Sequence, residues 1–379
     1  MPAAQRPTCA ITDLDALAFN FRSVKSFVGA DIKYLAVVKA DAYGHGAIMC
    51  SRRLEAEGVD WFGVAVPEEG VELRTGGIEA PILCLGGFWQ GQESLLLRER
   101  IIPAISSLEQ AGMFDRAASE RGEIANIHVK IDTGMGRIGI RADEAADFVG
   151  KLLKLKHLRV EALMTHLAAA DDLAQQEFTN EQILRFTEAI GTFRELGFRP
   201  DFVDIANSPG AVAHASSRKD MVRLGGVLYG LGGDVLPGGI PTPTLRPVLS
   251  LRTEISHLKR VPPGESLGYG RTFTTNGESV IASIPIGYAD GYPRGLSNKG
   301  RVIVNDRYAP IVGRVSMDWT IIDVTGIPNI ETGIPVILIG SSENCVILAE
   351  DLAAQIGTIS YEITCGIKQR VVHRFRGSS

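Results

Sequence analysis

Between Asp13 and about Gly233 the sequence alternates short apolar runs with helical stretches eight times. In the helical stretches, which include Ala47–Glu57, Leu108–Arg121, Ala142–Leu155 and Phe178–Leu196, apolar residues recur three and four positions apart. Eight strand–helix repeats predict an α/β fold, a (β/α)8 barrel of the TIM type. The helix Asp13–Val28 precedes the first run, so we expect the barrel to begin late. The predicted strands are Tyr34–Val38, Trp61–Val66, Ile82–Leu85, Ile102–Ile105, Asn126–Ile131, Val160–Thr165, Phe202–Ala206 and Met221–Leu224.

The composition of the sequence changes around residues 232–241, where Gly and Pro cluster. Helical periodicity then stops until Leu348–Ile356, and short β-rich runs separated by turn residues take over. We therefore predict a barrel domain over residues 1–240 and a mainly β-strand C-terminal domain over residues 241–379. The β-rich runs are Ser250–Leu258, Val280–Pro285, Arg301–Val304, Tyr308–Val312, Thr320–Val324, Pro335–Ile339 and Gln369–Phe375.

Composition narrows the class of protein. The 379 residues are ample for two domains, and a net charge of −5 with scattered basic residues argues against nucleic-acid binding. The five cysteines are widely spaced without a C-x-x-C pair, so neither a disulfide framework nor a structural metal site is indicated. Neither a secretory signal nor an 18-residue apolar run is present, so we expect a cytoplasmic protein without a membrane partner.

Polar or charged residues stand at the carboxyl ends of several apolar runs, where barrel enzymes gather their chemistry. The first of them, Lys39, ends the run Tyr34–Val38 and opens onto a Tyr-Gly-His-Gly turn. An amine at the rim of an apolar scaffold is a candidate Schiff-base former, because desolvation lowers its pKa. The alternative is an ordinary solvated lysine that follows a strand.

Five segments occur in the order found in one enzyme family. They are AVVKADAYGHG (36–46), KIDTGMGRIG (130–139), ANSPG (206–210), GYGRTF (268–273) and RVSMD (314–318). On these segments the chain resembles the alanine racemases, pyridoxal-phosphate enzymes of bacterial amino-acid metabolism, from about Thr8 to Arg374. The resemblance implies interconversion of L-alanine and D-alanine, with D-alanine serving peptidoglycan synthesis.

The resemblance assigns two bases to opposite faces of the substrate. Lys39 is the lysine that forms an aldimine with pyridoxal phosphate, and its freed amine acts on D-alanine. Tyr269 acts on L-alanine; because tyrosine has an ordinary pKa near 10, it needs nearby positive charge, which His166 and Arg223 would supply. Without the motif, Tyr269 would be an aromatic residue of a turn packed on the β domain.

Arg223 matches the arginine that this family directs at the pyridine nitrogen. Arginine only donates hydrogen bonds, so the ring nitrogen stays unprotonated. That should favour reprotonation at Cα over transamination. The alternative is an arginine paired with an acid at a barrel rim.

The remaining residues implied by the resemblance form three groups. Hydroxyl, backbone and turn groups would hold the cofactor phosphate, although the family usually has an aliphatic residue at the position of Gly226: Tyr43, Asn207, Ser208, Gly225, Gly226 and Tyr361. Arg137 and the backbone of Met317 would hold the substrate carboxylate. Lys130 stands at a position where many relatives carry a carbamylated lysine. An unmodified Lys130 beside Arg137 would need an anion to offset the like charges. The entrance corridor would comprise Asp171, Tyr288, Arg294, Arg314 and Ile359.

The resemblance also implies a homodimer in which each β domain reaches the partner's barrel with Tyr269 and Met317. Three alternatives remain at this point: a serine or broad-specificity racemase, a non-catalytic pyridoxal-phosphate-binding barrel, and a decarboxylase of related fold. A bulky Tyr361 beside the substrate Cβ favours alanine over serine. Other histidines, His45 among them, are interpreted as structural.

Overall fold

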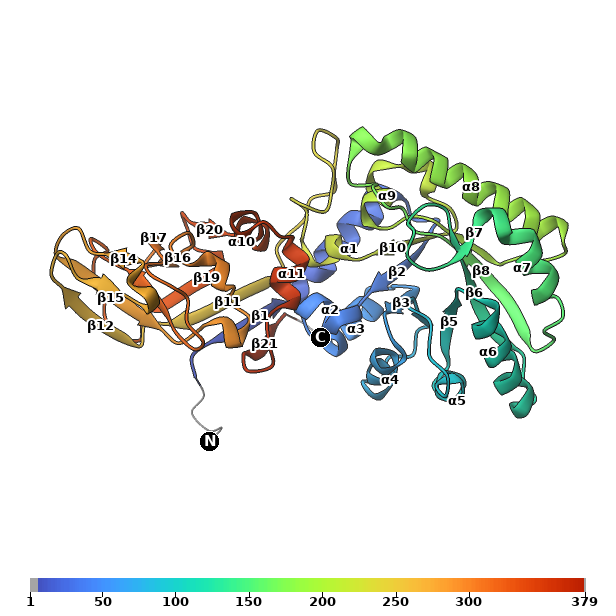
Figure 1. Ribbon diagram of the computed structural model, residues 1–379, viewed down its shortest axis with the longest axis horizontal. Helices are drawn as coiled ribbons and strands as arrows, with labels where there is room; N and C mark the ends of the chain where they lie inside the picture. Colours follow the sequence, from blue (N-terminus) through green and yellow to red (C-terminus); the bar gives the residue numbers. More distant parts are fainter. Residues whose placement is uncertain (1–5, 378–379) are drawn as a thin grey trace.

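Eight parallel strands close into a barrel in the computed structural model, which describes residues 6–377; the ends of the two predicted domain ranges, 1–5 and 378–379, lie outside it. The order around the barrel is β5-β4-β3-β2-β10-β9-β8-β6, and β5 closes it by pairing with β6. The predicted (β/α)8 barrel is confirmed, with each predicted strand found (Figure 1). The strands are β2 (Lys33–Val37), β3 (Trp61–Val64), β4 (Ile82–Cys84), β5 (Ile101–Ile105), β6 (Ala125–Asp132), β8 (Leu158–Met164), β9 (Phe202–Asp204) and β10 (Met221–Leu224).

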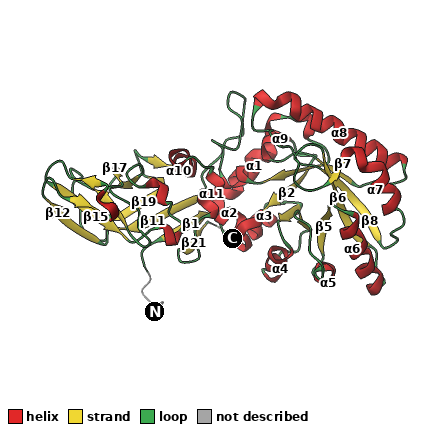
Figure 2. Ribbon diagram, viewed as in Figure 1, coloured by secondary structure: helices red, strands yellow, loops and turns green. Residues whose placement is uncertain are grey.

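Helices surround the barrel (Figure 2). In α8 the buried residues Ile183, Phe186, Ile190 and Phe193 recur at three and four positions, which lays one face on the strands. Ser107 accepts a hydrogen bond from the Gln110 amide and so caps α6. The helices are α1 (Leu14–Val28), α3 (Ala47–Ala56), α4 (Pro67–Thr75), α5 (Glu93–Arg98), α6 (Leu108–Arg121), α7 (Ala145–Leu152), α8 (Gln176–Glu195) and α9 (Ser208–Ala213). A short strand, β7 (Ile140–Arg141), pairs in parallel with the end of β6.

The second region is built mainly of strands and lies beside the barrel (Figure 1). Its largest sheet has the order β17-β16-β19-β11-β1-β21, with β20 on β19. A three-stranded sheet, β12-β15-β18, and a hairpin, β13-β14, complete it. The bounds are β1 (Cys9–Asp13), β11 (Leu249–Glu254), β12 (His257–Val261), β13 (Ser266–Leu267), β14 (Phe273–Thr274), β15 (Ser279–Ile284), β16 (Arg301–Val304), β17 (Arg307–Pro310), β18 (Thr320–Asp323), β19 (Pro335–Ser341), β20 (Val346–Ile347) and β21 (Val372–Arg376), with helices α10 (Ala349–Ile356) and α11 (Ser360–Cys365).

The first strand of the chain departs from the predicted division at residue 240. Strand β1 pairs antiparallel with β11 and parallel with β21, so it lies inside the sheet of the second region. Residues 1–240 therefore do not all belong to the barrel. The sequence before Asp13 shows only five strand residues, and nothing local indicates that their partners lie beyond residue 248.

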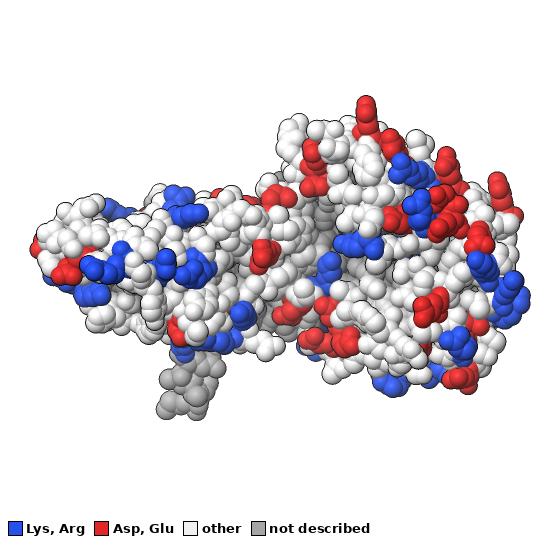
Figure 3. All heavy atoms as spheres, in the orientation of Figure 1, with Lys and Arg blue, Asp and Glu red and all other residues white. Residues whose placement is uncertain are grey.

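Charged side chains of both signs are interspersed on the face shown in Figure 3. Among the helices of residues 6–377, none has the length and apolar character needed to cross a membrane.

Candidate active site

The backbone directly after β2 forms a left-handed turn. Lys39 opens the segment α2 (Lys39–Gly44), in which four consecutive residues with side chains, Ala40 to Tyr43, have φ values of 52° to 56°. Each such residue costs roughly 1–2 kcal/mol relative to the right-handed conformation. Contacts from the rest of the protein must therefore hold the turn.

Those contacts come from three neighbouring elements. The Glu69 carboxylate in α4 accepts a hydrogen bond from the Ala40 amide at 2.7 Å. The Asp41 carboxylate accepts one from the Ala47 amide at the start of α3, at 2.6 Å. Gly44, with φ 79°, packs so tightly that a Cβ atom would lie 2.2 Å from the carbonyl oxygen of Thr364 in α11. The turn is thus fixed between the barrel and the C-terminal part of the chain.

The Lys39 side chain projects from this turn into a partly buried, positively charged environment. Burial lowers the pKa of Lys39, and the nearby Arg137 lowers it further, while Glu69 opposes the shift. A lowered pKa increases the fraction of free amine, which is the nucleophilic form. This environment differs from that of a solvated lysine at a strand end.

Arg223 on β10 is buried and is held by partners from the ends of two neighbouring strands, β8 and β9. Its Nη2 donates to the carbonyl oxygens of Thr165 at 2.8 Å and Ile205 at 3.1 Å, and lies 3.4 Å from Nδ1 of His166. Its Nη1 forms an ion pair with Asp204, which is fully buried. Burial raises the pKa of Asp204, whereas the guanidinium of Arg223 opposes that shift and favours the carboxylate.

Lys130 and His166 share the same electrostatic environment. Lys130 lies in β6 and is 5% exposed; burial, followed by Arg223 and Arg137, lowers its pKa to about 8. Burial and the charge of Arg223 also lower the pKa of His166 far below its ordinary value, so its imidazole is neutral. Contrary to the expectation from the sequence, His166 therefore supplies no positive charge for Tyr269, and that charge would have to come from Arg223. The structure therefore brings Lys39, Lys130, Arg137, His166 and Arg223 within electrostatic range of one another.

Two phenol groups converge on consecutive glycines after β10. A Cβ atom on Gly225 would lie 2.6 Å from Oη of Tyr43, and one on Gly226 would lie 2.6 Å from Oη of Tyr361. The rings of Tyr43 and Tyr361 are 5.4 Å apart between centroids. The backbone of the two glycines thus lies close to both phenol oxygens. Burial raises the pKa of both phenols, so both are protonated donors.

The loop after β9 places two further polar groups beside these glycines. Ser208 Oγ accepts a hydrogen bond from the Gly225 amide at 2.9 Å. Asn207 caps α9 by accepting from the Gly210 amide at 3.0 Å, and its Nδ2 donates to the Leu167 carbonyl at 3.2 Å. The Ser208 hydroxyl, the two phenols and the Gly226 amide thus form a group of hydrogen-bond donors suited to a phosphate group, with the Gly225 amide engaged by Ser208.

Tyr269 and Met317 do not join this cluster within the described chain. Their exposed fractions are 73% and 53%. Tyr269 lies in the short helix η5 (Tyr269–Arg271), between strands β13 and β14. Figure 1 shows β14 in the part of the second region that is remote from the barrel.

The residues predicted for the entrance are likewise exposed: Asp171, Tyr288, Arg294, Arg314 and Ile359. The amide of Tyr288 donates to the Ser316 carbonyl at 3.0 Å, and the amide of Ala289 to the Met317 carbonyl at 3.0 Å. Tyr288 and Met317 therefore lie on adjoining loops of the second region.

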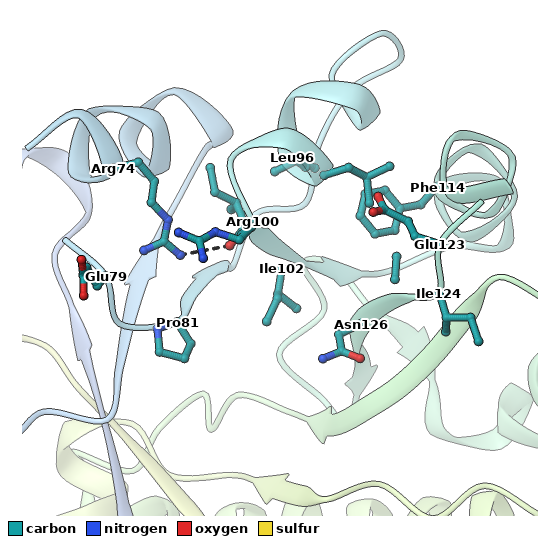
Figure 4. A pocket seen from close by; sticks show the side chains of 13 residues that line it. Arg74, Glu79, Pro81, Leu96, Arg100, Ile102, Phe114, Glu123, Ile124 and Asn126 are labelled. Atoms are coloured by element: carbon teal, nitrogen blue, oxygen red, sulfur yellow. Dashed lines mark hydrogen bonds between the residues drawn. The ribbon is translucent and has the colours of Figure 1, made fainter. Parts of the chain in front are cut away.

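A separate pocket lies at the opposite end of the barrel (Figure 4). Its lining includes Arg74, Arg100, the start of β5 and the start of β6. The Arg74 guanidinium donates to the carbonyl oxygens of Ile78, Ala80, Glu99 and Arg100, so its role there is to hold loops together. At the amino ends of barrel strands such residues serve stability rather than chemistry.

The comparisons with known proteins identify the family of the chain. The family model "Alanine racemase, N-terminal domain" matches residues 12–232, and "Alanine racemase, C-terminal domain" matches residues 248–375. The chain belongs to the alanine racemase family. It is 44% identical to the alanine racemase of Halothermothrix orenii over 373 residues, which covers 98% of this chain and 97% of that protein. It is 45% identical to that of Geobacter sulfurreducens over 372 residues, covering 97% and 96%.

Among solved structures, the chain resembles the alanine racemase of Bartonella henselae with covalently bound pyridoxal phosphate. The TM-score is 0.88 at 30% identity, with 98% of this chain and 99% of that chain covered. As a member of this family the chain is a pyridoxal-phosphate-dependent isomerase that racemises alanine. The hydrogen-bond donors around Gly225 and Gly226, together with the half-buried amine of Lys39, fit a cofactor that carries both a phosphate and a carbonyl group.

Several residues that shape this alanine racemase site were not predicted to act there. Asp204 pairs with Arg223, Glu69 caps the left-handed turn, and Asp234 accepts hydrogen bonds from the amide and hydroxyl of Ser360, next to Tyr361. Asp204 had one signal, a carboxylate inside the apolar run Phe202–Ala206. The other two sit in ordinary-looking helix and loop sequence, and only the fold brings them to the site.

Proposed function

We propose that Lys39 Nζ and Tyr269 Oη are the two groups that exchange the Cα proton of alanine, one on each face of the substrate. Pyridoxal phosphate, when bound, supplies the electron sink that stabilises the negative charge left at Cα. Lys39 removes or returns the proton on the D-alanine side and Tyr269 on the L-alanine side. The lowered pKa of Lys39 supports this role, because a base must spend part of its time unprotonated.

The remaining residues of the cluster would hold the cofactor and the substrate. The phosphate would lie among Tyr43, Asn207, Ser208, Tyr361 and the amides of Gly225 and Gly226. Arg137 and the amide of Met317 would hold the substrate carboxylate.

Arg223 would face the ring nitrogen of the cofactor. Its two terminal nitrogens are engaged by Thr165, Ile205 and Asp204, which leaves Nε as the donor for that nitrogen. A guanidinium cannot accept a proton, so Arg223 would keep the ring nitrogen unprotonated and favour return of the proton to Cα.

The second part of the proposal is a homodimer with shared active sites. The observation that carries it is the position of Tyr269, 73% exposed in a hairpin connection remote from the barrel of its own chain. In a two-fold dimer each chain would place Tyr269 and the Met317 amide at its partner's Lys39. Asp171, Tyr288, Arg294, Arg314 and Ile359 would line the corridor that leads substrate to this point.

Mixed dimers test the shared site. One chain carries Lys39→Ala and the other Tyr269→Phe, each nearly inactive as a homodimer. With shared sites, one site of the heterodimer collects both defects, while the other has an intact lysine and an intact tyrosine. We expect activity to recover to about half that of the wild-type dimer, by this two-site count. No recovery in a purified heterodimer would reject the shared site, because sites built within one chain each keep one defect.

Three finer points belong to the same proposal. Tyr361 beside the substrate Cβ would favour alanine over serine, which a comparison of the two turnover rates tests. The pKa of about 8 gives Lys130 the free amine that carbamylation by carbon dioxide requires, and a carbamate would offset the charge of Arg137. The five cysteines are free thiols, which fits a cytoplasmic enzyme that supplies D-alanine for peptidoglycan.

A further inference from the structure

His45 lies directly behind the left-handed turn and is completely buried. Its Nδ1 atom is 2.9 Å from the carbonyl oxygen of Ala42 and 2.9 Å from that of Tyr43. Carbonyl oxygens only accept hydrogen bonds, so Nδ1 must carry the hydrogen and donate to both. The imidazole thereby gives the Tyr43 carbonyl a donor, and it adds a second donor to the Ala42 carbonyl, which also accepts from the His45 backbone amide at 3.1 Å.

The ring and the backbone of His45 are held by contacts from the barrel and from the second region of the molecule. It stacks on Tyr229 with 4.6 Å between centroids, and the Tyr229 hydroxyl donates to the Val37 carbonyl, at the end of β2, at 2.9 Å. From β1, the Thr12 hydroxyl donates to the His45 carbonyl at 2.8 Å. The next residue, Gly46, faces the ring of Phe375 in β21, where a Cβ atom would come within 2.6 Å.

The burial of His45 also keeps it neutral. Burial lowers the pKa of His45 to about 4, so the ring carries one proton at neutral pH. With that proton on Nδ1, Nε2 is a buried acceptor, and it has no hydrogen-bond partner among residues 6–377. A ring with its hydrogen on Nε2 instead would leave the Tyr43 carbonyl without this donor, and the Ala42 carbonyl would keep only the His45 backbone amide, at 3.1 Å.

We propose that His45 is a positioning residue, whose Nδ1–H group holds the left-handed turn and so aims the Lys39 amine and the Tyr43 phenol at the cofactor. The proposal rests on the roles proposed above for Lys39 and Tyr43. It replaces the interpretation of His45 as a structural histidine with a specific one: loss of the donor should loosen the turn and the cofactor together. A general loss of packing would instead lower the stability of the protein without loosening the turn and weakening cofactor binding together.

Two substitutions of His45 separate the donor from the packing. In His45→Asn the side-chain amide nitrogen stands in the position of Nδ1 and can donate, whereas His45→Leu fills space but cannot donate. Phe114→Leu, a fully buried site in α6 at the other end of the barrel, is the control for general destabilisation. Each holoenzyme is measured for cofactor dissociation constant by absorbance titration and for amide hydrogen exchange of the peptide covering residues 40–46.

We expect His45→Leu to raise the dissociation constant of pyridoxal phosphate at least tenfold and to speed exchange in the 40–46 peptide. His45→Asn should stay within about threefold of wild type in both measurements. Phe114→Leu should lower the melting temperature and move neither measurement. If His45→Leu behaves like Phe114→Leu, the positioning role is wrong. Faster exchange with unchanged cofactor affinity also overturns it, since the turn would then be loosened without consequence; the role of Lys39 itself is judged separately by covalent labelling.

A measurement on the unmodified protein remains decisive if His45→Leu does not fold. Nitrogen-15 chemical shifts of labelled histidine report which ring nitrogen is protonated. We expect the His45 signal to show a protonated Nδ1 and an unprotonated Nε2. The opposite tautomer would overturn the proposal, because an unprotonated Nδ1 cannot donate to Ala42 and Tyr43.

Discussion

The two turns that carry the proposed proton-exchanging residues are built in opposite ways. The Lys39 turn is strained and half-buried. It is held by backbone amides that donate to the carboxylates of Glu69 and Asp41, and by the close packing of Gly44 against the Thr364 carbonyl. The Tyr269 turn also has positive φ values, at Gly268, Gly270 and Arg271, but its tyrosine is 73% exposed. One half of the site is therefore preorganised within the chain, while the other half would, in the proposed dimer, be presented to the partner subunit. Substitutions on the barrel side should cost stability or cofactor binding, whereas those at Tyr269 should cost activity alone.

The largest effect should come from Lys39→Ala. Loss of both the covalent attachment and one base should lower kcat/KM by about 10⁴-fold or more. In wild type, borohydride reduction followed by peptide mass spectrometry should find the cofactor on Lys39. Lys33→Ala, on β2 with a side chain 43% exposed, is the matched control and should keep activity. Labelling of another lysine would contradict the assignment.

Tyr269→Phe should lower the racemisation rate by about 10²–10⁴-fold, the usual contribution of a general acid–base group. Cofactor affinity and melting temperature should stay at wild-type values, because the hydroxyl is exposed in the free chain. Tyr308→Phe, a partly exposed tyrosine of β17, serves as the control and should remain fully active. A fall of several degrees in melting temperature for Tyr269→Phe would show instead that the ring packs on the second region.

Two glycine substitutions compare the strain of the two regions directly. Gly44 and Gly264 have similar φ values, 79° and 84°, but a Cβ atom meets the Thr364 carbonyl at Gly44 and nothing within 4 Å at Gly264. Gly264→Ala should cost about 1 kcal/mol for the left-handed backbone alone. Gly44→Ala should cost about 4 kcal/mol, since overpacking adds to the same strain. Denaturant unfolding measures both values; equal costs would mean that α11 yields easily.

The smallest effect concerns the pH dependence of stability through Lys130. Its folded-state pKa of about 8 lies below the ordinary value of 10.5, so between these values the unfolded chain binds more protons. Stability from this group should therefore rise as pH increases from about 8 to 10.5, by roughly 3 kcal/mol in total. Lys130→Met should flatten that rise in urea titrations. A wild-type enzyme without the rise, but with carbamate found on Lys130, would show that the modified lysine is already anionic.

Much of the fold could be predicted because its signals are local. The eight barrel strands and the helices between them follow from apolar runs and from spacing within each segment. Strand β1 could not be predicted in the same way, because its partners are Arg252 and Val372, hundreds of positions away along the chain. Helix α11 was also missed: it is six residues long, and its first turn is capped by Asp234 rather than by a neighbour in sequence.

The candidate site shows the same limit. Lys39, Arg223 and Ser208 were found because they follow apolar runs and lie in recognisable segments. The left-handed backbone from Ala40 to Tyr43 has no signal in residue type, since alanine, aspartate and tyrosine rarely adopt it. His45 lies within the segment 36–46 and Asp204 two residues before the segment 206–210, yet their importance depends on which atoms the fold places beside them.

Strand β1 has a consequence for how the chain is made. It sits between β11 and β21, so its neighbours on either side are synthesised more than 200 residues apart from it, the last of them at residues 372–376. On the ribosome the segments of the barrel emerge in order, and local strand–helix units can form as they appear. The N-terminal strand, by contrast, can pair with β11 only after residues 249–254 have emerged, and its other edge stays open until residues 372–376 follow. The sheet of the second region therefore needs a strand from the N-terminal part of the chain. A fragment beginning at residue 241 would lack β1, an internal strand of that sheet.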